Sequence, residues 1–256
     1  MMNAFMFFSF ILKVYAVRII REPLYATWDW RDVAPVGNYL TPIRNQHNPR
    51  YCGSCWAFAT SSAISDRLNI VKNNNNVSTV LSPQYLLDCI SAYDGCDGGD
   101  SYSVYKHAIK KGLVSESCSP YKAVTAKSCI SCYTCSEDGS CADVKKYERV
   151  FISSVTQLPQ NDVDKIKREI QSRGPIVCST CVSDAFEKEY TSGVWYGENI
   201  TELSDLNHMV SIIGYGIDYW IVRNSWGDFF GEKGFYKVNM DHSNDGLLLD
   251  CSAPVF

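Results

Sequence analysis

The sequence lacks any excess of positive charge and any apolar run long enough to cross a membrane. Its 24 Lys and Arg residues are outnumbered by 28 Asp and Glu, and the net charge of −4 gives no indication of a nucleic-acid partner or an anionic lipid surface. The apolar stretch Ala4–Leu12 is much shorter than the roughly 20 residues that span a bilayer. We therefore expect neither nucleic-acid binding nor a membrane span.

The sequence also lacks internal repeats and the composition of disordered chains. Hydrophobic residues make up 46% and charged residues 20% of its 256 positions, which is ordinary globular usage. No similarity recurs with a period of about 20–50 residues, which argues against a solenoid. At about 100–200 residues per domain, the length predicts one or two domains.

Cysteine is absent from the first 51 residues and then abundant, with all twelve cysteines between Cys52 and Cys251. Because cytosolic thiols are kept reduced, so many cysteines indicate an oxidising compartment. Ala4–Leu12 has the length of a signal-peptide apolar region, although no positive charge precedes it. Two glycosylation sequons, at Asn76 and Asn199, agree with the secretory route.

Helices are predicted in the first half of the chain. From Trp56, apolar residues recur with helical spacing as far as Val71, and Ser54 is a candidate N-cap. The four cysteines within residues 129–141 indicate a stapled loop. Start and stop signals predict further helices from Ser82-Pro83, over about 101–111 and over Val163–Arg173.

Strands dominate the second half of the chain. Helices first and strands later predict an α+β fold arranged as two lobes. The strand-like runs are Ile176–Val182, Met209–Tyr215, Tyr219–Arg223, Phe235–Met240 and Leu247–Cys251.

One cysteine stands where nucleophilic chemistry is favoured. Cys55 follows Cys52-Gly53-Ser54 at the start of the first predicted helix. Unpaired N–H groups and the helix dipole at that position favour the thiolate over the thiol. A thiolate attacks carbonyl carbons, and a histidine beside it completes the activation by taking or holding the proton.

His208 is the best-placed proton carrier among the four histidines, because it immediately precedes a predicted strand that can hold it rigidly. Sixteen residues later, Asn224 ends another predicted strand. Its side-chain carbonyl can accept from one ring nitrogen of His208 and orient the other toward Cys55. Trp226 can shield this hydrogen bond from water.

These residues carry a family resemblance. The segment Cys52-Gly53-Ser54-Cys55-Trp56-Ala57-Phe58, with His208 and Asn224-Ser225-Trp226-Gly227 far downstream, resembles the papain-type cysteine proteases over about residues 28–251. The resemblance implies two lobes, one helical and one β-barrel-like, with Cys55 and His208 facing across a cleft. It also implies that Gln46 donates its amide to the oxyanion hole beside the Cys55 N–H. Substrate-binding positions implied by the resemblance are Gly98 and Gly99 of Cys96-Asp97-Gly98-Gly99, and Trp226.

The insert His47-Asn48-Pro49-Arg50-Tyr51 separates Gln46 from Cys55 by more residues than is usual in that family. It resembles the mini-loop of the cathepsin X (cathepsin Z) subfamily, whose histidine binds the C-terminal carboxylate of the substrate, so that one residue is removed. A protonated imidazole forms a strong, charge-assisted hydrogen bond with a carboxylate. We therefore expect His47 to bind that carboxylate, and the activity to fade above a pH of about 6.5 as the imidazole loses its charge.

The same resemblance implies how the cysteines are distributed. Cys55 is the nucleophile, and Cys181 is expected to be a free, buried thiol. The implied disulfides are Cys52–Cys96, Cys89–Cys129, Cys118–Cys132, Cys135–Cys141 and Cys178–Cys251.

The resemblance also implies a domain organisation. We expect a signal-like segment or short proregion over 1–24 and a peptidase unit over 25–256. Within that unit we expect a helical lobe over about 45–142, and a β-rich lobe over about 143–256 that residues 25–44 join. Proregions of the subfamily carry a cysteine that blocks the active-site thiol. None precedes Cys52, so either such inhibition is expected to be absent or the sequence is truncated.

The resulting functional hypothesis is a monomeric cysteine carboxypeptidase with no cofactor and no metal. It would act at acidic pH, in a lysosome-like compartment or after secretion, on peptides or proteins with a free C-terminus. Three alternatives remain: an endopeptidase with a longer loop, a catalytically inactive binding homologue, and a zinc module formed by Cys129, Cys132, Cys135 and Cys141. A cathepsin B-like dipeptidase is disfavoured, because residues 100–141 contain only His107 where a histidine pair is needed.

Overall fold

The computed structural model describes residues 23–34, 37–73, 79–90, 95–125, 128–241 and 244–256. The predicted signal-like segment, apart from its last residues, and the sequon at Asn76 lie outside these ranges. Within them, no helix is both long and apolar enough to cross a membrane. The elements run in the order β1 (Trp28–Asp29), α1 (Cys55–Val71), α2 (Pro83–Cys89), η1 (Gly95–Asp97), α3 (Ser101–Lys110), β2 (Tyr133–Cys135), β3 (Cys141–Asp143), β4 (Ser154–Gln157), α4 (Val163–Arg173), β5 (Ile176–Thr180), α5 (Asp184–Glu189), β6 (Val194–Trp195), η2 (Leu203–Asp205), β7 (His208–Tyr215), β8 (Tyr219–Arg223), β9 (Phe235–Asn239) and β10 (Cys251–Val255).

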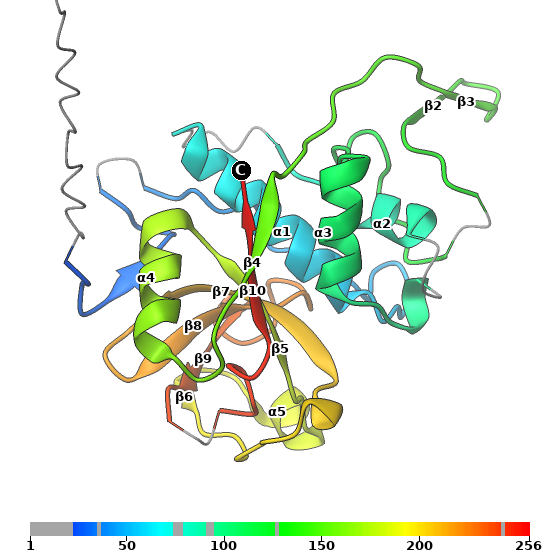
Figure 1. Cartoon of the computed structure of the whole chain (residues 1–256). Helices are drawn as coiled ribbons and strands as arrows, with labels where there is room; N and C mark the ends of the chain where they lie inside the picture. The colour runs from blue at the N-terminus through cyan, green and yellow to red at the C-terminus, as the bar shows by residue number, and fades with distance from the viewer. Residues whose placement is uncertain (1–22, 35–36, 74–78, 91–94, 126–127, 242–243) are drawn as a thin grey trace, which may run out of the picture.

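The helical lobe consists of α1, α2 and α3, which lie together on one side of the molecule (Figure 1). Short polar side chains start the two shorter helices: Ser82 Oγ accepts from the Tyr85 N–H, and Asp100 Oδ1 accepts from the Ser103 N–H. The predicted N-cap Ser54 makes no such bond, because its hydroxyl is paired with Tyr121 instead. Leu81, Leu86 and Val104 are fully buried between these helices.

The β-rich lobe is one open sheet with the strand order β4-β10-β5-β7-β8-β9-β6. The short strand β1 also pairs with β7 but has no place in this order. Only the β6–β9 pair is parallel; the other pairs in this sheet are antiparallel. The central strand β7 is buried along nearly its whole length, which explains its continuous apolar run. The α+β class with two lobes is therefore confirmed, but the expected barrel-like closure of the β lobe is absent from the described strands.

Two hydrophobic cores meet along α1. The larger core lies between the sheet and α4, around Ile166, Ile212 and Trp220. The smaller core fills the helical lobe, and it also takes in Val177 of β5 and Met209 of β7. Because strands of the sheet contribute to both cores, the two lobes are packed directly against each other.

Two buried ionic pairs connect the same helix to the β-rich lobe. Asp66 lies 2.9 Å from Arg223 at the end of β8, with both side chains almost fully buried. Arg67 lies 2.9 Å from Glu169 of α4. Its remaining donors bind the carbonyls of Gly174, Pro175 and Pro254.

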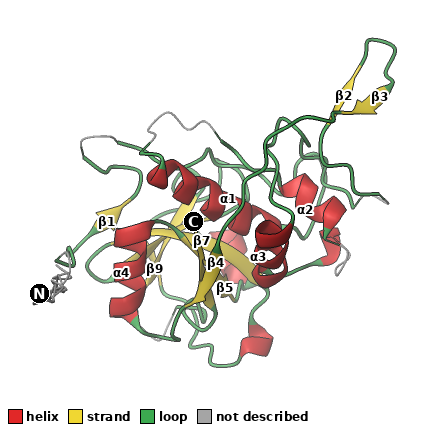
Figure 2. Ribbon diagram, turned by 45° about the horizontal axis from the view of Figure 1, so that its top comes forward, coloured by secondary structure: helices red, strands yellow, loops and turns green. Residues whose placement is uncertain are grey.

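One further local prediction is wrong. The segment Leu247–Leu249 is a buried turn, and the strand begins only at Cys251. An unbroken apolar run fits any fully buried backbone, so it cannot distinguish a strand from a turn. The stapled loop of residues 129–141 contributes to a short hairpin, β2–β3, which projects from the body of the molecule (Figure 2).

The five disulfides of the structure join the pairs that the resemblance implies: Cys52–Cys96, Cys89–Cys129, Cys118–Cys132, Cys135–Cys141 and Cys178–Cys251. The four cysteines of the alternative zinc module are therefore all oxidised, which leaves them no thiolate to offer a metal. Cys55 and Cys181 are the free cysteines, and Cys181 is partly exposed rather than buried.

Candidate active site

Cys55 is the first residue of α1, at the point where the helical lobe faces the sheet. The backbone of Met209, the second residue of β7, lies close enough to this sulfur to lower the pKa of the thiol. The preceding Cys52 is tied to Cys96 by a disulfide, and the Gly53 N–H donates to the Cys96 carbonyl at 2.6 Å. A Cβ at Gly53 would meet that same carbonyl oxygen at 2.6 Å, so only glycine permits this approach.

His208 and Asn224 are brought together by neighbouring strands. His208 begins β7 and Asn224 follows β8, and these two strands pair antiparallel. His208 Nε2 lies 2.9 Å from Asn224 Oδ1, which also accepts from the Ser225 N–H at 2.8 Å. Because the carbonyl oxygen only accepts, Nε2 carries the proton and Nδ1 of a neutral ring is left as an acceptor.

Burial governs the ionisation of the pair. It lowers the pKa of His208 to about 4, against weaker raising effects of Asn224 and Glu187. Burial likewise raises the pKa of the Cys55 thiol, and backbone hydrogen bonds from Met209, Trp56 and Cys55 oppose this only in part. Loss of hydration therefore opposes the thiolate that the helix N-terminus favours.

Gln46 is held with one amide hydrogen to spare. Its Oε1 accepts from Ser225 Oγ at 2.6 Å, and its Nε2 donates to the Cys52 carbonyl at 3.0 Å. A carboxamide nitrogen has two hydrogens, so one remains. Gln46 is only 3% exposed and borders the same cavity as Cys55 and His208, so the spare donor suits a developing oxyanion.

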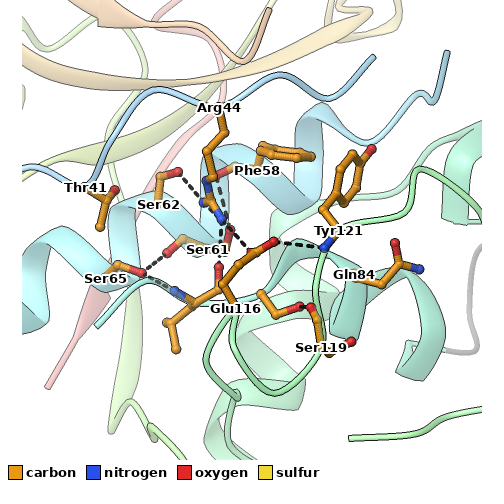
Figure 3. A network of polar contacts seen from close by, with 12 residues as sticks. Thr41, Arg44, Phe58, Ser61, Ser62, Ser65, Gln84, Glu116, Ser119 and Tyr121 are labelled. Carbon is orange, nitrogen blue, oxygen red and sulfur yellow. Dashed lines mark hydrogen bonds and ion pairs between the residues drawn. The ribbon is translucent and has the colours of Figure 1, made fainter. Parts of the chain in front are cut away.

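Tyr121 supports this arrangement from the helical lobe. Its hydroxyl donates to the Gln46 carbonyl at 2.7 Å and lies 2.7 Å from Ser54 Oγ. Burial raises the pKa of Tyr121 to about 12, so the hydroxyl keeps its proton and Ser54 must be the donor in the second bond. The Tyr121 N–H in turn donates to Glu116, which pairs with Arg44 at 3.2 Å (Figure 3).

His47 lies in the loop between Gln46 and the nucleophile. Its ring stacks on Tyr51 with a centroid separation of 4.6 Å, and its Nδ1 accepts the Cys52 N–H at 3.5 Å. A neutral His47 therefore carries its proton on Nε2. Burial, and next the neighbouring His208, lower the pKa of His47 below its ordinary value of 6.5, while Glu187 raises it. The pH above which His47 loses its charge is thus lower than the sequence predicts.

Two cavities meet at the Cys55–His208 pair, and both also touch Tyr51. The glycine-side cavity, of about 650 Å³, is bordered by Gly98, Gly99, Asp97, Asp100 and Asp250 among others. The His47-side cavity, of about 250 Å³, is bordered by Gln46, His47, Val182, Glu187 and Trp226 among others.

The candidate substrate-binding residues border these cavities. Gly98 has a φ of +131° with open space where a Cβ would stand, so its backbone is accessible to an extended peptide. A Cβ on Gly99 would lie 2.5 Å from the Trp56 ring. The backbone can therefore approach Trp56 this closely only if residue 99 is glycine. Trp226 packs on His208 with ring centroids 5.1 Å apart, which covers the bond to Asn224.

The structure thus brings Cys55, His208, Asn224, Gln46 and His47 to one cleft. Sequence reasoning missed Tyr121, Met209 and Glu187, which have no motif of their own. Ser225 is adjacent to Asn224 in the quoted motif, yet nothing in the spacing predicted that it would bind Gln46.

Comparisons with known proteins agree with this geometry. Residues 24–254 match the family model described as papain family cysteine protease. A cathepsin Z of Onchocerca volvulus is 39% identical over 225 residues, which are 85% of this chain and 71% of the relative. Among solved structures, digestive procathepsin L 3 from the larval midgut of Tenebrio molitor is 30% identical with a TM-score of 0.75, over 93% of this chain and 72% of the other. The cysteine protease CMS1MS2 of Carica candamarcensis is 27% identical with a TM-score of 0.74, over 90% and 98% of the two chains.

Proposed function

Because this chain belongs to the papain family of cysteine proteases, we propose that it is a carboxypeptidase that removes single residues from the C-terminus of peptides. The observation that carries the proposal is the position of His47, which borders the same small cavity as Cys55 and His208. A cation or N–H donor that lines the same cavity as the nucleophile suits a carboxylate one residue beyond the cleaved bond. The likeness to a cathepsin Z supports the same activity.

The proposed chemistry begins with a neutral pair. Nδ1 of His208 accepts the thiol proton as the Cys55 sulfur attacks the carbonyl carbon of the last peptide bond. The spare Nε2 hydrogen of Gln46 and the Cys55 N–H stabilise the oxyanion, a contribution worth about 10²–10³ in rate for one donor. His208 then gives its proton to the leaving amine, and later takes one from the water that hydrolyses the thioester. Asn224 keeps the ring oriented throughout.

His47 is proposed to bind the substrate carboxylate through Nε2–H. Nδ1 of the neutral ring already accepts the Cys52 N–H. The single donor of the ring, Nε2–H, is therefore left for the substrate. Protonation of Nδ1 would release the Cys52 N–H and give the ring a positive charge, which strengthens the bond from Nε2–H to the carboxylate. A bound carboxylate also raises the pKa of His47, because an opposite charge favours the charged form. The lowered pKa of free His47 is therefore partly restored by the substrate.

An acidic working range fits the state of His208. With a pKa of about 4 it remains neutral at pH 5, where an ordinary imidazole would be largely protonated and unable to accept the thiol proton.

We further propose a lysosome-like or secreted location and a monomeric state. The proposed limits of the two lobes are about 45–142 and 143–256.

The test compares one peptide as the free acid and as its C-terminal amide. We expect the acid to lose one residue and the amide to be cleaved at least tenfold more slowly, because the amide offers no negative charge. His47→Ala should abolish this preference. Arg50→Ala is the matched control, since Arg50 is an exposed residue of the same loop that borders neither cavity. Equal cleavage of acid and amide by the parent enzyme would instead identify an endopeptidase.

A further inference from the structure

We propose that Glu187 makes the His47-side cavity select substrates whose departing C-terminal residue has a basic side chain, lysine or arginine. This rests on the proposed carboxypeptidase activity and names the substrate class for it. The residue borders the same cavity as His47, on a helix that neither the motif nor the spacing of the sequence singled out.

Glu187 is fixed at the cavity by its helix. It belongs to α5, whose N-terminus is capped by Ser183 Oγ accepting from the Phe186 N–H. Phe186 is 3% exposed and packs among Tyr190, Trp195, Phe230 and Tyr236, which anchors the helix to the β-rich lobe. The next residue, Glu187, is held by this anchored helix at the border of the cavity that His47 and His208 also line.

The carboxylate of Glu187 has no ion-pair partner among the described residues. Its neighbour Lys188 is 2.8 Å from Asp184, one helical turn earlier, so the nearest cation of the helix is already engaged. The basic titratable groups that border this cavity from other elements are the imidazoles of His47 and His208. Glu187 raises the pKa of both, which agrees with its proximity to them, but burial lowers both more strongly.

The cavity linings contain no competing positive charge. Among the described residues that border either cavity there is no lysine and no arginine. The glycine-side cavity adds three further carboxyl groups, of Asp97, Asp100 and Asp250. A cationic substrate side chain therefore meets an attractive field along the whole cleft, and Glu187 is the carboxylate on the side of the departing residue.

A charge count shows why the side chain of the departing residue matters. The substrate carboxylate and Glu187 are two negative charges in one small cavity, and a protonated His47 balances only one of them. A substrate ending in lysine or arginine supplies the second positive charge and leaves the cavity neutral. A substrate ending in alanine leaves one uncompensated negative charge, and one ending in glutamate leaves two.

Glu187 has a second conceivable role, as a counter-ion that only keeps His47 protonated. The two roles predict different measurements. A counter-ion changes cleavage of all free-acid peptides by the same factor, whereas a specificity determinant changes the ratio between peptides with different last residues. The ratio is therefore the quantity to measure.

The experiment uses peptides that differ only in the last residue: lysine, Nε-acetyl-lysine and glutamate. The acetylated residue keeps the lysine stem and removes its charge. For the parent enzyme we expect kcat/KM for lysine to exceed that for acetyl-lysine by about 2–5-fold, and glutamate to fall below acetyl-lysine by a similar factor. This is the range expected for an exposed charge pair, and Glu187 is exposed. The lysine preference should decline as salt is raised from about 0.02 to 0.5 M.

Glu187→Gln should bring the lysine to acetyl-lysine ratio close to one, and Glu187→Lys should invert it. Glu189→Gln is the matched control, because it lies on the same exposed helix but borders neither cavity. The inference is overturned if Glu187→Gln trims peptides with an unchanged ratio, or if Glu189→Gln lowers the ratio equally.

Failure of the carboxypeptidase proposal gives a different result. In that case amidated peptides are cleaved as fast as free acids. An internally quenched, amidated peptide with lysine or acetyl-lysine immediately after the cleaved bond then measures the same ratio. Loss of the lysine preference in Glu187→Gln would support the role of Glu187 even in an endopeptidase, and its persistence would refute it.

Discussion

Replacing Tyr121 by phenylalanine tests whether the support beneath Gln46 matters for catalysis. The substitution keeps the ring against Phe58 and removes only the hydroxyl that joins Gln46 to Ser54. Both partners are buried, with Gln46 3% and Ser54 0% exposed, so water cannot easily replace the lost bonds. The variant therefore separates the hydrogen bonds of Tyr121 from its packing.

The magnitude follows from two lost hydrogen bonds. Each contributes about 0.5–1.5 kcal/mol net, so the free energy of unfolding should fall by about 1–3 kcal/mol. For a chain of this size that corresponds to a fall in Tm of about 2–4 °C for each kcal/mol. Because Gln46 keeps its bonds to Ser225 and Cys52, we expect its amide to be loosened rather than lost. We therefore expect kcat to fall about 5–50-fold, less than the roughly 10²–10³ for removal of an oxyanion donor.

The assay is a double-mutant cycle of Tyr121→Phe with Gln46→Ala, measured by kcat and by thermal unfolding. If Tyr121 acts through Gln46, its substitution should change kcat little once Gln46 is alanine, while the loss of stability persists. Tyr147→Phe is the control, because it removes a hydroxyl that pairs with Arg149 away from both cavities. The reasoning fails if Tyr121→Phe lowers Tm with kcat unchanged, or if the two losses in kcat are fully additive.

The pH profile of kcat/KM for a free-acid peptide should rise on an acid limb near pH 4, where His208 becomes neutral, and a limb near pH 6.5 instead would contradict the effect of burial. Asp66→Asn should lower the free energy of unfolding by about 3–5 kcal/mol, because it leaves the charge of Arg223 buried without its partner, and a loss below about 1 kcal/mol in chemical denaturation would argue against this. Thiol titration of the denatured, unreduced protein should find two thiols, from Cys55 and Cys181, and any other number would require a different distribution of the cysteines.

The parts of the fold that the sequence predicts are those where pattern and burial coincide. The helix after Cys55 has apolar residues at helical spacing, although it is buried on all sides from Trp56 to Asn69. The strands β7 and β8 are short, mostly apolar segments. These elements bring His208 and Asn224 together, and their positions at strand ends are what led the sequence to predict the contact. The turn over Leu247–Leu249 was not predicted, because its three buried leucines have the same apolar pattern as a buried strand. The chain turns at Asp245 and Gly246, which adopt left-handed conformations.

The parts of the site that could not be predicted depend on contacts between residues that lie far apart in the sequence. Tyr121 reaches Gln46 across 75 residues of chain, and no local pattern encodes such a contact. The pKa of Cys55 depends mainly on how completely the surrounding residues exclude water from the thiol. That is a property of tertiary packing, which the sequence does not show directly. The sequence offers the helix N-terminus, which favours a thiolate, but not the burial that opposes it.

The position of α1 has a consequence for how the cleft can move. Its first residue is Cys55, and its middle turns carry Asp66 and Arg67, whose buried partners belong to the β-rich lobe. Opening the cleft by a hinge would break both buried ionic pairs, at about 3–5 kcal/mol for each pair. We therefore expect substrates to enter a cleft whose width changes little. Redesign of specificity should exchange the loop of His47 and the helix α5 and leave the interface between the lobes untouched.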